Sequence, residues 1–140
     1  MQRSFVYKRK VNYYETDKMG VVHHSNYIRF MEEARIEFLE ANGMSYAEFE
    51  ARGLISPVVA VNCEYKFPAV FGDELDVLVE IKEYTGVKYV YEYLVTKSQS
   101  GELVAKGRTE HCLTNKEGRP IIVKRQFPDL HEVFAKLVEE

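Results

Sequence analysis

Hydrophobic residues follow two different periods along this chain, and the changes between them predict the order of its elements. Residues 5–13 alternate, and their apolar side carries Phe5, Tyr7, Val11 and Tyr13. Alternating aromatic residues and valines predict a first strand with one covered face, with Arg9 as an exception on the apolar side. From residue 54 the period is again two, and turn-forming residues at 68–73, 85–86 and 98–101 divide that region into strands. Because short loops join these strands, we expect an antiparallel meander, then a turn at 115–118 and a short last strand at 121–124.

Between these regions, residues 27–41 have the spacing of a long helix. At 100° per residue the apolar stripe consists of Tyr27, Phe30, Met31, Ala34, Phe38 and Ala41, widened by Ile28 and Leu39. Such a stripe covers about half of the circumference, more than the roughly 100° that a helix needs on a flat surface, so we expect a curled sheet to wrap it. Ser25 and Asn26 are predicted to cap its start, and Asn42-Gly43 its end. A further short helix is expected at 46–52.

The C-terminal residues return to helical spacing. A narrower apolar stripe there consists of Leu130, Val133, Phe134, Leu137 and Val138. Asp129 with Glu132 resembles a capping box with the aspartate as the cap. The layout of strand, long helix, four or five strands and helix is α+β, and 140 residues predict one domain over 1–140.

Composition narrows the class of protein. The net charge of −3 offers no basic surface for nucleic acid, so the tyrosines at 89, 91 and 93 are expected in the core or at a subunit contact. No apolar run is long enough to span a membrane, and no N-terminal signal segment is recognised. Cys63 and Cys112 are too few and too far apart for a disulfide framework, and we expect buried thiols. A cytoplasmic location follows as the expectation.

The candidate chemistry lies just before the long helix. Gly20 permits a sharp bend after Asp17, and a helix start carries unpaired N–H groups and a partial positive charge. We therefore expect a carboxylate and several donors to face one small space, which suits an acyl group whose carbonyl oxygen gains negative charge. The histidines and cysteines lack the spacing of a metal site, so no metal is expected. No Gly-x-Ser-x-Gly elbow occurs either. Singly, these residues do not identify a function.

Their order is more informative. Residues 13–27 read YYETDKMGVVHHSNY and run into EARIEFL at 33–39. This block resembles the signature of the hotdog-fold acyl-CoA thioesterases, and more narrowly the 4-hydroxybenzoyl-CoA thioesterase group and its Tol–Pal-associated branch. A second block, EYKFPA at 64–69 followed by Gly72-Asp73, is similar to the segment that follows the helix in that family.

The resemblance implies a hotdog fold, in which a curled antiparallel sheet wraps one long helix, here with an added C-terminal helix. It also implies homodimers or homotetramers with sites at the subunit interface. Asp17 falls on the family's catalytic carboxylate, and His24 on the residue whose backbone N–H binds the oxyanion. The substrate contacts that it implies are Gly20, Val22, Tyr27, Val59, Lys66 and Lys88. Of the cations that hold phosphates of coenzyme A in some members, only Lys88 is present at the turn 85–88.

The implied activity is hydrolysis of an acyl-CoA thioester to a free acid and coenzyme A. Asp17 would act as nucleophile or as general base, and no cofactor is needed beyond the coenzyme A of the substrate. A thioester on acyl carrier protein is an alternative substrate. A non-catalytic acyl-CoA-binding protein and a hotdog dehydratase remain as alternative functions, although Asp17 before the glycine turn is misplaced for a dehydratase.

Overall fold

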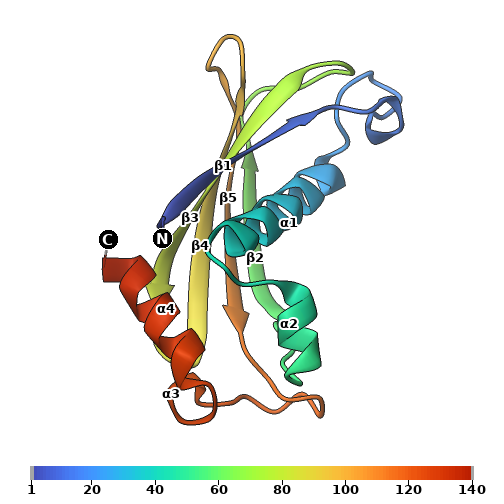
Figure 1. Ribbon diagram of the computed structural model, residues 1–140. Coiled ribbons are helices and arrows are strands. Elements are labelled where there is room, and N and C mark those ends of the chain that lie inside the picture. Colours follow the sequence, from blue (N-terminus) through green and yellow to red (C-terminus); the bar gives the residue numbers. More distant parts are fainter. Residues whose placement is uncertain (1, 140) are drawn as a thin grey trace.

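The computed structural model describes residues 2–139 and contains one antiparallel sheet with helices on its concave side (Figure 1). The strands are β1 (Ser4–Lys10), β2 (Val58–Tyr65), β3 (Glu74–Tyr84), β4 (Lys88–Lys97) and β5 (Leu103–Cys112), in the order β1-β3-β4-β5-β2. The helices are the 3-10 turn η1 (Tyr13–Glu15), α1 (His24–Ala41), α2 (Tyr46–Ala51), α3 (Val123–Gln126) and α4 (Pro128–Glu139). This is the predicted α+β layout.

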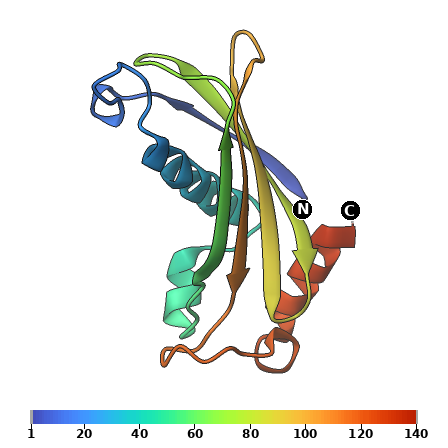
Figure 2. The same ribbon diagram turned by 180° about the vertical axis from the view of Figure 1, so that it is seen from behind.

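Helix α1 lies against the concave side of the sheet, and seen from behind the strands curve around it (Figure 2). Phe30, Met31, Ala34 and Phe38 of the predicted stripe are fully buried, so the expectation of a wrapped helix is confirmed. The helix comes so close to β5 that a side chain added at Gly107 would collide with the Met31 thioether. Its end is also as predicted, because Gly43 adopts a φ of 80° and the Met44 N–H donates to the Leu39 carbonyl at 2.8 Å.

The prediction of a simple meander is wrong for β2. Strands β3, β4 and β5 do follow one another, but β2 pairs with β5 at the far edge and not with its chain neighbour β3. The segment 66–73 crosses the end of the sheet, where Val22 N–H donates to the Ala69 carbonyl and Val11 N–H to the Asp73 carbonyl. These bonds join residues far apart in the sequence, and a periodicity along the chain does not report them.

Three local expectations need correction. The first strand ends at Lys10, and Tyr13 is 76% exposed in η1 and not on a covered face. The residues expected as a last strand at 121–124 lead into α3, because only Pro120 pairs back to Thr114 before the chain turns helical. Asp129 is not a cap but the second residue of α4, since Pro128 with its fixed φ starts that helix.

The interior polar groups include the three tyrosines of β4. Tyr89, Tyr91 and Tyr93 are each 1% exposed, so the expected core position is confirmed. Cys63 and Cys112 are free thiols that are only partly buried, because both lie on strand positions near the open edge of the sheet. Within residues 2–139, no helix is long and apolar enough to cross a membrane.

Candidate active site

Asp17 lies on a short turn that the backbone itself closes. Its N–H donates to the Val21 carbonyl at 2.8 Å, and the Gly20 N–H donates to the Asp17 carbonyl at 2.9 Å. Gly20 adopts a φ of 81°, which explains the glycine at this position. The Oδ1 of Asp17 accepts from the Met19 N–H at 2.8 Å. The carboxylate is therefore fixed by its own turn, and it is half-buried at the start of a cavity.

An ion pair of the largely buried Arg9 supports the turn that carries Asp17. Arg9, the exception on the apolar side of β1, donates from Nη1 to Glu15 Oε1 at 2.6 Å, and its Nε forms an ion pair with Glu33 Oε1 at 2.9 Å. Its guanidinium lies over the Phe30 ring, 4.0 Å from the centroid. The backbone carbonyl of Glu15 in turn accepts from the His23 N–H at 2.9 Å and from Asn26 Nδ2 at 2.8 Å. This contact joins η1 to the first turn of α1.

The predicted caps of α1 are wrong, since the helix begins at His24 and its N-cap is His23. The His23 Nδ1 accepts from the Ser25 N–H at 3.2 Å, and the His23 carbonyl accepts from the Asn26 N–H at 2.9 Å. As the first helical residue, His24 has no intrahelical acceptor for its own N–H. Among residues 2–139 no other acceptor takes that N–H. One backbone donor is thus left free at the start of α1.

Asp17 and His24 both line the same cavity of about 380 Å³. Of the predicted site residues, it brings together Asp17, Val22, His24, Tyr27 and Lys66. The remaining lining comes from Met19 and Val21 on the turn and from Tyr65, Phe67 and Pro68 at the end of β2. A mostly apolar pocket with a few convergent polar groups is the usual form of a small-molecule site.

Three other predicted residues lie outside the lining of this cavity. Gly20 is within the turn itself, between two residues that line it. Val59 lies near the opposite end of β2, and Lys88 forms an ion pair with Glu110 at 2.9 Å at the start of β4. The structure of a single chain therefore does not join Val59 and Lys88 to the other site residues, and their substrate contacts stay a prediction.

The aromatic wall of the cavity is the feature that sequence reasoning missed. The Tyr65 ring lies 5.6 Å from that of Tyr27 and 6.2 Å from that of His24, centroid to centroid. Its hydroxyl donates to the His24 carbonyl at 3.3 Å, which ties the end of β2 to the start of α1. The signal was present in the block EYKFPA, whose aromatic residues flank Lys66, but only contact with α1 shows that they face the site.

The titratable groups of the aromatic wall are uncharged near neutral pH, because their pKa values are raised. Burial raises the pKa of Tyr27 to about 12, against the opposing effect of a hydrogen bond with the Ala69 backbone. Burial is also the main cause that raises the pKa of Tyr65 and of the Cys63 thiol beside it. In neutral solution these groups are protonated, so the wall adds polarity without charge.

Residues 11–138 match the thioesterase-like superfamily. The chain belongs to this family. The DHNA-CoA thioesterase of Staphylococcus aureus has a structure that superposes with a TM-score of 0.92 at 35% identity, covering 96% of this chain and 90% of that one. The fold prediction, a hotdog domain, is thereby confirmed.

Two relatives extend the comparison for this thioesterase-like chain. The candidate acyl-CoA thioesterase YneP of Bacillus subtilis is 38% identical over 91% of this chain and 92% of its own length. The long-chain acyl-CoA thioesterase FadM of Escherichia coli is 31% identical over 91% of this chain and 96% of its own. The superfamily prediction is confirmed, and the narrower Tol–Pal-associated branch stays a prediction.

Proposed function

We propose that this chain hydrolyses acyl-CoA thioesters, with Asp17 and the His24 N–H acting on the two sides of the thioester carbonyl. The observation that carries the proposal is that Asp17 and His24, whose backbone N–H has no acceptor among the described residues, line one mostly apolar cavity. The acyl group packs against Tyr27 and Tyr65, and the carbonyl oxygen points to the start of α1. Relatives named as acyl-CoA thioesterases support the reaction class.

The negative charge that develops during the reaction lies next to groups of this chain that can stabilise it. As the carbonyl carbon is attacked, its oxygen becomes an oxyanion, and the His24 N–H and the helix dipole stabilise it. Collapse of that intermediate breaks the carbon–sulfur bond and expels the thiolate of coenzyme A, which takes up a proton. The His24 side chain, exposed at the cavity, is suited to orient the water or the leaving thiolate.

Asp17 has two routes to the same products. As general base it removes a proton from water while the water oxygen attacks, and that proton later reaches the thiolate. As nucleophile it forms an anhydride with the acyl group, and water then hydrolyses the anhydride. A single turnover in ¹⁸O-labelled water that leaves label in the Asp17 carboxyl group identifies the nucleophilic route, with water attacking the Asp17 carbonyl carbon of the anhydride.

Two copies are part of the proposal. β2 is an edge strand that exposes Val58, Val59 and Val61, and an unpaired apolar edge favours pairing with another strand. If two β2 strands pair antiparallel, the start of one lies beside the end of the other, so Val59 of one copy approaches Tyr65 and the cavity of its partner. Sedimentation decides between monomer, dimer and tetramer.

The test is release of free thiol from a panel of aromatic, short-chain and long-chain acyl-CoAs and acyl carrier protein thioesters. A thioesterase gives thiol and free acid, a dehydratase gives an enoyl product, and a binding protein gives neither. The same thiol-release assay on variants that lack Lys66 or Lys88 tests whether these lysines contact coenzyme A, since their removal should raise KM for the CoA thioester. A cytoplasmic location belongs to the proposal, because acyl-CoA is made and used there.

A further inference from the structure

We propose that His23 is a positioning residue of this reaction, whose neutral imidazole caps α1 so that the His24 N–H alone remains free for the oxyanion. The proposal rests on the proposed function. Its basis is the geometry of the first turn: the His23 backbone has the extended angles of an N-cap, φ −64° and ψ 137°. Nδ1 lies 3.2 Å from the Ser25 nitrogen and 2.8 Å from the Ser25 hydroxyl oxygen.

These contacts fix the protonation state of the ring. A backbone N–H only donates, so the Nδ1 that faces Ser25 accepts and carries no proton. The ring proton of the neutral form is then on Nε2. A doubly protonated imidazole has a hydrogen on each nitrogen and accepts nothing, so proton uptake removes the cap.

Loss of the cap acts directly on the proposed oxyanion site. In the capped turn, the Ser25 and Asn26 N–H groups are taken by His23, and the His24 N–H is left. With the cap gone, the Ser25 N–H is also free, and the first turn is held only by its bonds to the Glu15 and His23 carbonyls. The two imidazoles are stacked, with centroids 4.2 Å apart, so movement of His23 carries His24 with it. Because the donor acts on the transition state, the loss falls on kcat more than on KM.

Other titratable groups meet this turn and have to be separated from His23. His24 is stacked on it, and Tyr65 bonds to the His24 carbonyl. Asp17 lies on the turn before α1, and Glu15, which is bound by Arg9, contacts His23 through its backbone carbonyl. Either histidine or a carboxylate can give an acidic limb in the pH profile of kcat, and the variants distinguish these sources.

The experiment compares pH profiles of kcat for thiol release in four variants: His23→Ala, His23→Asn, His24→Gln and the control His131→Asn. His23→Ala removes the cap and should lower kcat on the order of tenfold at pH 7.5, the rate equivalent of a typical N-cap, with KM changed less than about twofold. His23→Asn supplies a capping oxygen that does not titrate in this range. It should recover most of the kcat that alanine loses, and its profile should lack the acidic limb. His131→Asn is the matched control, since His131 bonds to Tyr84 on the other side of the molecule, and its profile should keep that limb.

Several results would overturn the proposal. They are an unchanged kcat in His23→Ala, an acidic limb that persists in His23→Asn, or a limb that disappears only in His24→Gln. In each case a folded variant is established by its thermal melt. If Asp17→Asn is inactive while one of these results holds, only the role of His23 fails. If Asp17→Asn is as active as the natural chain, the proposed function itself fails.

Discussion

The two ends of helix α1 lie in different surroundings: the start borders an open cavity, and the second half lies inside the core. At the start, His23, His24 and Ser25 are exposed, the His24 N–H has no acceptor among the described residues, and an open cavity lies beside it. The second half of the helix packs over buried polar side chains of the sheet: Tyr93 of β4 bonds to Thr109 of β5 at 2.6 Å, and His111 of β5 bonds to Thr109 at 2.7 Å.

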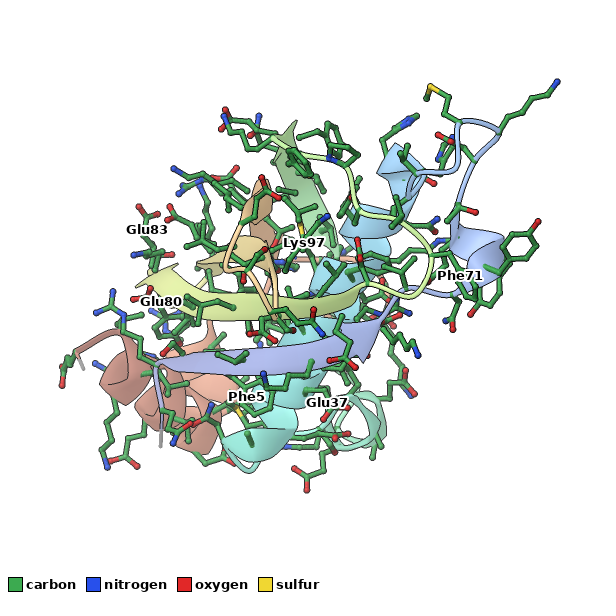
Figure 3. The ribbon with its side chains drawn as sticks, turned by 90° about the horizontal axis from the view of Figure 1, so that it is seen from above. Phe5, Glu37, Phe71, Glu80, Glu83 and Lys97 are labelled. Carbon is green, nitrogen blue, oxygen red and sulfur yellow. The ribbon has the colours of Figure 1, made fainter. Side chains whose placement is uncertain are left out.

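This difference separates the region that can act on a substrate from the region that stabilises the fold. A hydrogen-bond donor that is left free beside a cavity can act on a substrate, whereas the buried bonds of Thr109, one of which joins β4 to β5, lie inside the core and contribute to stability. In the view from above, Phe71 marks the end of the molecule that carries the turn before α1, and Glu80 and Glu83 lie toward the opposite end (Figure 3). Changes at the two ends should therefore have different effects.

The largest expected effect is at the open end. Asp17→Asn keeps the size of the side chain and removes its charge, so kcat should fall about 10²–10⁴-fold, the usual contribution of a general base. The thermal melt and the oligomeric state should not change. Asp129→Asn, the same substitution on the far side, serves as the control and should keep its kcat.

At the buried end, Phe38→Ala should act on stability. The Phe38 ring is fully buried, with its centroid 5.6 Å from that of Tyr91, so its truncation should lower the free energy of unfolding by about 3–5 kcal/mol. Phe71→Ala, at a ring that is 60% exposed, should cost less than about 1 kcal/mol. Urea melts compare the two, and equal losses would contradict the division between the ends.

His111 gives the buried end a pH dependence. Burial, and next the nearby Arg35 charge, lower the pKa of His111 to about 3. The unfolded chain binds a proton near pH 6.5 and the folded chain does not, so stability is full above pH 6.5 and falls as the pH drops toward 3. Between pH 6.5 and 4.5 the loss should be about 2–3 kcal/mol, at 1.4 kcal/mol per unit. In urea melts of His111→Gln, this part of the pH dependence of stability should be absent. An unchanged pH dependence would show that His111 is not its source.

The smallest effect is expected where α2 meets α4. Arg52 donates twice to the Asp129 carboxylate, at 2.8 Å each, and this pair holds the pKa of Asp129 at about 2. Asp129→Asn should cost under 1 kcal/mol, since the side chain is 63% exposed and solvent screens the pair. The contribution is present above pH 4 and disappears as the pH falls through about 2. Thermal melts should show a larger difference between the two chains at pH 7 than at pH 2.5.

The sequence predicted the parts of the fold that local patterns determine. The stripe from Tyr27 to Phe38 predicted a wrapped helix, and the alternation in β3, β4 and β5 predicted their meander. It did not predict the place of β2. Val59 and Val61 follow the period of a strand with one covered face, although both side chains are exposed. A strand that pairs at a far edge is decided by contacts across the sheet, and those are absent from a periodicity.

For the site, residue order was more informative than residue type. It placed Asp17, His24 and Tyr27 at one cavity, but Ser25 was taken for the cap that His23 supplies. Serine is the usual N-cap and histidine is not, so propensity favoured the wrong residue. The aromatic residues Tyr65 and Phe67 reach the cavity only through the path of the segment after β2.

The central claim is that Asp17 and the His24 N–H meet at one thioester carbon. The most direct measurement is a crystal structure of Asp17→Asn with an uncleaved acyl-CoA. We expect the thioester carbonyl oxygen to accept from the His24 N–H, with the carbonyl carbon beside the side chain at position 17. A thioester bound away from this cavity, or with its oxygen turned from the start of α1, would contradict the claim.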